Sequence, residues 1–243
     1  MMPQQVSGAI APPVLTQNLL LSITEQLKLP LLHIARQAEL AGFNKETGSL
    51  QSIQVAADSA LRLLDNYILG VQLACQQVCL PEVEPVSVAS VLYDATEQLQ
   101  PMATAYGVKL DLDIDGRYGP VMAHRQGLQA ALVSLGYALV EALPAQGLPQ
   151  MRLRLSAHRC RYGIVAGLYC DGEQVATQAL RRGRQLYGRA RQPLGSISHT
   201  SSAGVFVADA ILHAMQSQLT VSHYRRMHGL GTILSLSSQL QLL

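Results

Sequence analysis

A proline inside an amphipathic helix pattern most constrains the amino-terminal part of this chain. The apolar positions recur every three or four residues: Leu20, Ile23, Leu27, Leu31, Ile34 and Ala38. This spacing predicts a helix from about Thr16 to Leu40 with one apolar face. Pro30 lies within the run. Because proline lacks a backbone donor and crowds the preceding turn, we expect the helix to bend or bulge there.

A second amphipathic pattern follows the turn-forming segment 41–48 and predicts a helix from about Ser49 to Cys79. Its apolar stripe has heptad spacing over more than three repeats: Leu50, Ile53, Ala57, Ala60, Leu64, Tyr67, Val71 and Ala74. Two long helices joined by a short turn predict an antiparallel hairpin. Such a hairpin should dimerise into a four-helix bundle. The alternative is that it packs on the rest of its own chain.

Composition excludes several classes of protein. Apolar residues make up 49% of the 243 residues, which predicts a folded globular chain. No run approaches the roughly 18–20 apolar residues of a membrane span, and the start lacks a signal-like pattern. We therefore expect a cytoplasmic protein that binds neither membrane nor nucleic acid. The net charge of +2 adds little about partners.

Two groups of side chains were weighed as sites. Cys75 and Cys79 stand one helical turn apart, with buried thiols as the expected state and a metal or redox pair as the alternative. A basic cluster comprises Arg181, Arg182, Arg184, Arg189 and Arg191. We expect it to be a solvated loop, although such a cluster could also meet phosphate or an acidic partner.

Two prolines within 81–85 predict a linker between domains. We expect a flexible tail at 1–14, the helical hairpin at 15–80 and a second domain at 86–243. In the second domain the pattern predicts strands at 86–88, 108–115, 151–156, 162–169, 219–224 and 232–236, and helices at 90–106, 124–143, 174–187 and 203–216. The apolar strand 162–169 should be central, and strand 108–115 should carry three aspartates on one solvated face.

This arrangement resembles sensor histidine kinases over residues 15–243. Glu25 to Leu31 is similar to the family's phosphoacceptor motif, in which the phosphorylated histidine stands five residues before the proline. Glu25 occupies that position here. The order of elements after residue 84, with Gly231 and Thr232 before the last strand, resembles the ATP-binding domain shared with gyrase and heat-shock ninety chaperones. The resemblance implies an α+β chain: a helical hairpin followed by an α/β sandwich of that ATPase type.

The residues that such a domain uses for nucleotide are altered. Ser134 and Ala138 stand where the resemblance implies a magnesium-binding asparagine. Cys170 and Gly172 stand in the motif whose aspartate recognises adenine, with cysteine in place of the aspartate. Gly204 is kept in the lid motif, but Phe206 replaces its second glycine. We therefore expect no cofactor, no metal and no ATP-dependent autophosphorylation.

The resulting hypothesis is a catalytically inactive histidine kinase homologue that forms a homodimer and docks a response-regulator receiver domain or a related signalling protein. By the resemblance, the contacts would include Glu25, Lys28, Pro30 and His33. Two alternatives stay open. His33 could act as a non-standard phosphoacceptor of a histidine phosphotransferase, or the altered nucleotide cleft could bind another ligand.

Overall fold

The computed structural model describes residues 23–24, 27, 31–32, 34–36, 38–39, 47–75, 79, 82–143, 151–171, 175–186 and 203–237. The described positions between 23 and 39 are helical. Glu25, Lys28, Pro30 and His33 lie outside the described residues, so the bend at Pro30 and the contacts expected there stay predictions.

The described chain alternates helices and strands after one long helix. The elements are α2 (Thr47–Ala74), β1 (Glu84–Val86), α3 (Val88–Ala105), β2 (Lys109–Ile114), β3 (Val121–Ala123), α4 (Arg125–Ala142), β4 (Arg152–Cys160), β5 (Gly163–Cys170), α5 (Val175–Leu186), α6 (Ala203–Ala214), β6 (Thr220–Tyr224) and β7 (Met227–Leu234). The α+β class expected from the sequence is confirmed.

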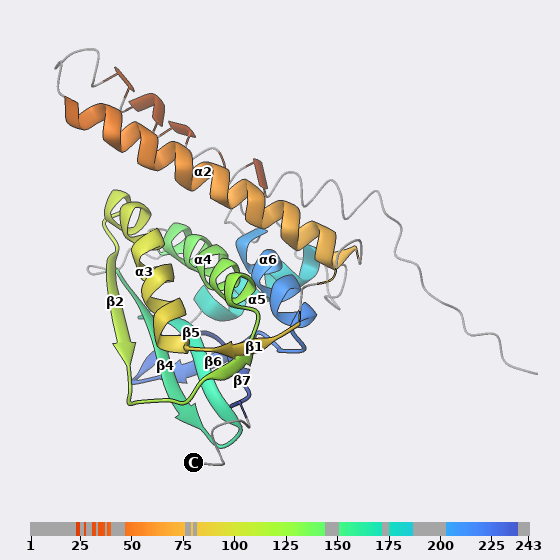
Figure 1. Ribbon diagram of the computed structural model, residues 1–243. Coiled ribbons are helices and arrows are strands. Elements are labelled where there is room, and N and C mark those ends of the chain that lie inside the picture. The colour runs from red at the N-terminus through yellow and green to blue at the C-terminus, as the bar shows by residue number, and fades with distance from the viewer. Residues whose placement is uncertain are drawn as a thin grey trace, which may run out of the picture.

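Five strands form one mixed sheet in the order β2-β4-β5-β7-β6. Strands β2 and β4 are parallel, and the other neighbours are antiparallel. All residues of β5 are buried, as expected of the middle strand, because both of its faces are covered. Helices α3, α4, α5 and α6 cover one face of the sheet, and α2 crosses over this helical layer (Figure 1).

Helix α2 packs on its own chain through a stripe that shares only Ala60 and Tyr67 with the predicted heptad stripe. Its buried positions are Ala56, Ala60, Leu63, Tyr67, Gly70 and Leu73. A Cβ added at Gly70 would lie 2.9 Å from Cγ2 of Val207 in α6. Leu50, at the start of the heptad stripe, is 67% exposed. The carboxyl-terminal part of α2 therefore packs on the rest of its own chain, which was the alternative given above to packing in a dimer.

Several boundaries differ from the sequence prediction for physical reasons. Strand β1 begins at Glu84, inside the predicted linker, because it pairs with β3, a three-residue strand too short to predict. Strand β7 begins at Met227, so Gly231 and Thr232 lie within it and not before it.

The cysteine prediction was also wrong. Helix α2 ends at Ala74, and both Cys75 and Cys79 are exposed where buried thiols were expected.

Candidate functional site

The centre of the candidate site is the junction between α4 and α6. Gly204, in the first turn of α6, meets α4 so closely that an added Cβ would clash with the carbonyl oxygen of Ser134 and lie 3.1 Å from Cβ of Ala138. All three residues are buried. The positions that the sequence assigned to phosphate and magnesium therefore form a direct helix–helix contact.

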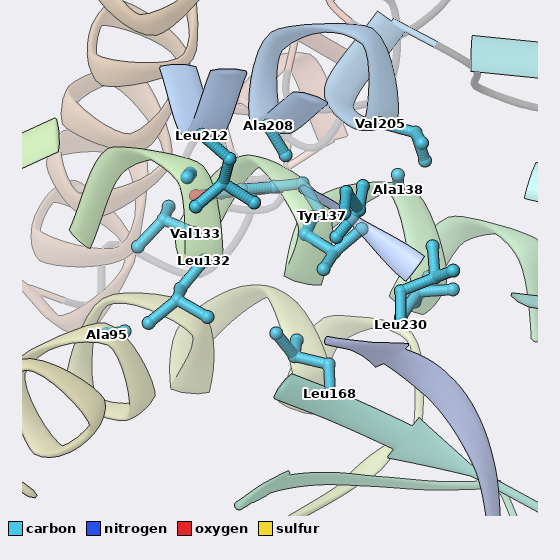
Figure 2. Packing of buried hydrophobic residues seen from close by; sticks show 14 of the residues in the cluster. Ala95, Leu132, Val133, Tyr137, Ala138, Leu168, Val205, Ala208, Leu212 and Leu230 are labelled. Atoms are coloured by element: carbon cyan, nitrogen blue, oxygen red, sulfur yellow. The ribbon is translucent and has the colours of Figure 1, made fainter. Parts of the chain in front are cut away.

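Apolar side chains complete this junction on both sides of α4. Figure 2 shows Val205 and Ala208 of α6 on one side of Tyr137 and Ala138, and Leu168 of β5 on the other. Helix α4 buries twelve of its eighteen residues, since it lies between the sheet and the outer helices. Only small side chains on its α6-facing side allow such a close approach.

Two further predicted positions are part of the same core. Cys170 is the last residue of β5, is fully buried, and pairs across the sheet with Leu153 and His228. Phe206 is also fully buried and belongs to the main apolar cluster. Gly172, which follows Cys170 in the predicted adenine motif, lies outside the described residues.

The hydroxyl of Ser134 is the polar exception in this region. Its Oγ is buried and has no hydrogen-bond partner within the described ranges. A buried hydroxyl without a partner is uncommon, because its desolvation is then not offset.

The basic cluster is built differently from the predicted loop. Arg181, Arg182 and Arg184 lie on helix α5, while Arg189 and Arg191 lie outside the described residues. Arg184 donates to the carbonyl oxygen of Leu219 at 2.8 Å and lies 3.8 Å from Asp209 of α6. Its guanidinium therefore ties α5 to α6 and to the segment before β6, which is a structural role.

The aspartates of β2 are also not a simple solvated face. Asp111 and Asp113 lie 3.8 Å and 3.7 Å from the guanidinium of Arg154 on β4. Arg225, in the β6–β7 turn, approaches Asp113 to 2.8 Å. Asp111 and Asp113 therefore pair with arginines on a partly exposed face of the sheet, a contact that the expected solvated face did not include.

Sequence reasoning missed a group of titratable side chains where α2 meets α3 and α4. Tyr67 of α2 is 1% exposed, and burial raises the pKa of its phenol, with Glu141 of α4 adding to the effect. Burial also raises the pKa of Tyr106, again with a contribution from Glu141. Neither hydroxyl has a hydrogen-bond partner within the described part of the chain. No local sequence signal joins residues so far apart, so only the heptad position of Tyr67 hinted at its burial.

A second stripe of α2 remains open. Leu61 and Ile68 are 60% and 55% exposed, Leu64 between them is half-buried, and Leu50 continues the stripe toward the start of the helix. These four residues are called the open stripe below. Three- and four-residue steps place them on one helix face, which adjoins the face buried on α6.

Comparison with known proteins identifies the fold. No family model and no curated protein matches the sequence. A solved structure titled Acinetobacter baumannii histidine kinase AdeS is 12% identical, with a TM-score of 0.51 over 87% of this chain and 98% of that one.

Full-length histidine kinase ShkA in complex with AMPPNP gives a TM-score of 0.52 at 11% identity, over 94% of this chain and 47% of that one. The protein thus has the histidine kinase fold, in agreement with the resemblance read from the sequence.

A nucleotide does not fit the described residues at the α4–α6 junction. Gly204 contacts the backbone of Ser134, and Ala138 offers no oxygen or nitrogen beyond its backbone. Magnesium prefers oxygen ligands and keeps several waters, which a buried apolar junction does not supply. Among the described residues, no three His, Cys, Asp or Glu side chains gather as a metal site, and no helix is long and apolar enough to span a bilayer.

Proposed function

We propose that this protein is a histidine-kinase-like pseudoenzyme of two-component-type signalling that works as a dimeric docking or regulatory protein. In this proposal the hairpin at 15–80 carries the partner surface, and residues 86–243 are a structural support without ATP-dependent autophosphorylation. The observation that carries it is the direct contact of Gly204 with Ser134 and Ala138 at the α4–α6 junction.

The packing around this contact supports loss of the nucleotide cleft. Phosphate binding at a helix start depends on free backbone amides and room for the anion. Here Ala203, Gly204, Val205 and Phe206 are all buried at the start of α6. Small helix-facing residues and a large buried aromatic have replaced groups that could face a ligand.

The open stripe supports the dimer. Leu50, Leu61 and Ile68 are large apolar side chains exposed on a helix whose neighbouring face is already buried. Leu31 and Leu32, in the described part of the preceding segment, are also more than half exposed. Large apolar side chains exposed on one helix face mark an interaction site, and the same stripe of a second copy has the matching period.

Sedimentation of the wild type and a Leu61→Glu, Ile68→Glu variant tests the dimer. We expect a wild-type dimer and a folded monomeric variant, because a carboxylate in an apolar seam is desolvated without a partner. Arg62→Glu is the control, since Arg62 is exposed on the same helix and lies about 100° around the helix axis from Leu61, off the stripe. A monomeric wild type, or a variant that still dimerises, contradicts this part of the proposal.

Binding of a phosphorylatable receiver domain tests the docking role. The resemblance assigns the contacts to Glu25 and Lys28, with Pro30 and His33 nearby, so a Glu25→Arg, Lys28→Glu variant should lose at least tenfold in affinity. Lys109→Glu is the control because Lys109 is an exposed residue on the β2 strand of the second domain. Undetectable wild-type binding, or equal binding by the Glu25, Lys28 variant, would reject docking at this surface.

A further inference from the structure

The face of the sheet away from the helices carries a separate small apolar cluster. Tyr169, Tyr224 and Met227 form it and are 0%, 8% and 5% exposed. The imidazole of His158 on β4 stacks on the ring of Tyr224, with centroids 4.6 Å apart and planes 10° from parallel. We call these four residues the outer-face cluster. Its burial requires a cover, because none of the described helices lies on this side of the sheet (Figure 1).

The cover is the turn between β6 and β7. Its two central residues, Arg225 and Arg226, have positive φ values of 45° and 65°, as a two-residue turn with the twist of a hairpin requires. Arg225 lies 2.8 Å from Asp113 and 3.7 Å from Asp115. Strand β2 is at the opposite edge of the sheet from β6. The turn therefore lies over the intervening strands, and Arg225 forms ion pairs with Asp113 and Asp115 at the β2 edge.

The closed position is weakly held. Arg225 is half exposed, so its ion pairs are screened by solvent and contribute little. Nδ1 of His158 is buried without a hydrogen-bond partner among the described residues. The Tyr224 hydroxyl lies beside Ser156 without reaching hydrogen-bond geometry.

We propose that the β6–β7 turn is a proton-controlled cover, closed while His158 is neutral and opened when its imidazole takes up a proton. Opening would expose Tyr169 and Met227 as a new apolar surface on the outer face of the sheet. The device is independent of the nucleotide region and of the open stripe on α2.

The charged and titratable groups around His158 set the direction of the response. Burial lowers the pKa of His158 from 6.5, and Asp115, after β2, opposes this in part. Tyr169 and Tyr224 face the ring from β5 and β6, and the Tyr118 hydroxyl donates to the carbonyl of neighbouring Ala157. A base with a lowered pKa in the closed state destabilises that state as pH falls below about 6.5. A protonated imidazole also competes with Arg225 for Asp115.

Amide hydrogen exchange of the whole chain tests the cover, measured between about pH 8 and pH 5, where carboxylates stay ionised. After correction for intrinsic rates, protection at residues 224–227 should fall below pH 6.5, by up to about tenfold per pH unit. His158→Phe keeps an aromatic ring in the stack and removes the proton site, so its protection should not change with pH. His213→Gln, on α6, is the control and should behave as the wild type.

Two results would overturn the proposal. One is wild-type protection at the turn that does not change over this range. The other is an equal pH response in His158→Phe. If that variant does not fold, nuclear magnetic resonance of the wild type tests the proposal. The ring signals of Tyr224 should shift with the same pH midpoint as those of His158. Tyr224 ring signals that do not change as His158 titrates contradict the cover.

Discussion

The α4–α6 junction and the open stripe of α2 are opposite in character, although both lie in the helical layers of one molecule. At the junction, Gly204 lets two helices meet in direct contact. On the open stripe, Leu61 and Ile68 remain exposed on a helix whose other face packs on α6. A ligand site needs room, and a docking site needs uncovered apolar surface. The comparison favours protein–protein contact over nucleotide chemistry.

The largest expected effect is a difference in the free energy of unfolding between variants on the buried face and on the open stripe of α2. Leu63→Ala should lower the free energy of unfolding by about 3 kcal/mol, because it leaves a cavity against the second domain. Leu61→Ala, on the open stripe, should change it by less than about 0.5 kcal/mol when the protein is monomeric. Urea unfolding at one low protein concentration measures both. Equal losses would mean that both faces are buried in the monomer.

Gly204→Ala tests how tightly the junction is closed. We expect a loss of about 2 kcal/mol, because the new methyl group meets the backbone of Ser134, which cannot move without shifting α4. Gly136→Ala is the matched control, because its methyl group would meet side-chain atoms of Leu99, which can change rotamer. A smaller loss at Gly204 than at Gly136 would show that the junction is loose.

The start of α4 offers a smaller effect. His124 caps the helix, with its Nδ1 accepting from the amide of Gly127 at 3.1 Å. His124→Ala should cost about 1 kcal/mol, whereas His124→Asn should keep most of the stability, because asparagine is a good N-cap. Thermal unfolding of the two variants measures the difference. Equal stabilities would mean that the cap contributes nothing to holding α4 at the junction.

The smallest effect at neutral pH concerns the tyrosines around Glu141. Tyr67→Phe should change stability by less than about 1 kcal/mol, because the lost hydroxyl has no partner among the described residues. Both Tyr67 and Tyr106 have pKa values raised above 10.0 in the folded state. Their stabilising effect is present below pH 10 and is lost as pH rises further. A Tyr67→Phe, Tyr106→Phe variant should therefore lose less stability than the wild type in urea titrations above pH 10, and an unchanged alkaline loss would contradict this.

Much of the fold could be predicted because its elements carry strong local patterns. The apolar run of β5 identified the middle strand, and the predicted helix at 124–143 matches α4 closely. Strand β3 has three residues and no pattern of its own. The start of β7 was missed because Gly231 was interpreted as part of a motif that precedes the strand, whereas Gly229 and Gly231 lie within it, close against β5.

The candidate site was harder to predict. Sequence identified Ser134, Ala138, Gly204 and Phe206 as altered positions, but only packing brings the first three into contact. Helix α2 has two apolar stripes, and the sequence could not tell which one faces the domain. The pair of Arg225 and Asp113 joins residues 112 positions apart. Such contacts depend on the tertiary structure and leave no mark in local periodicity.

Calorimetric titration of the whole protein with ATP and magnesium, taken to millimolar ligand beside an active histidine kinase domain, tests the central claim most directly. The account predicts no saturable heat, because the direct contact between α4 and α6 leaves no site. Saturable binding that is lost in a Ser134→Leu variant would place nucleotide at this junction and contradict the account.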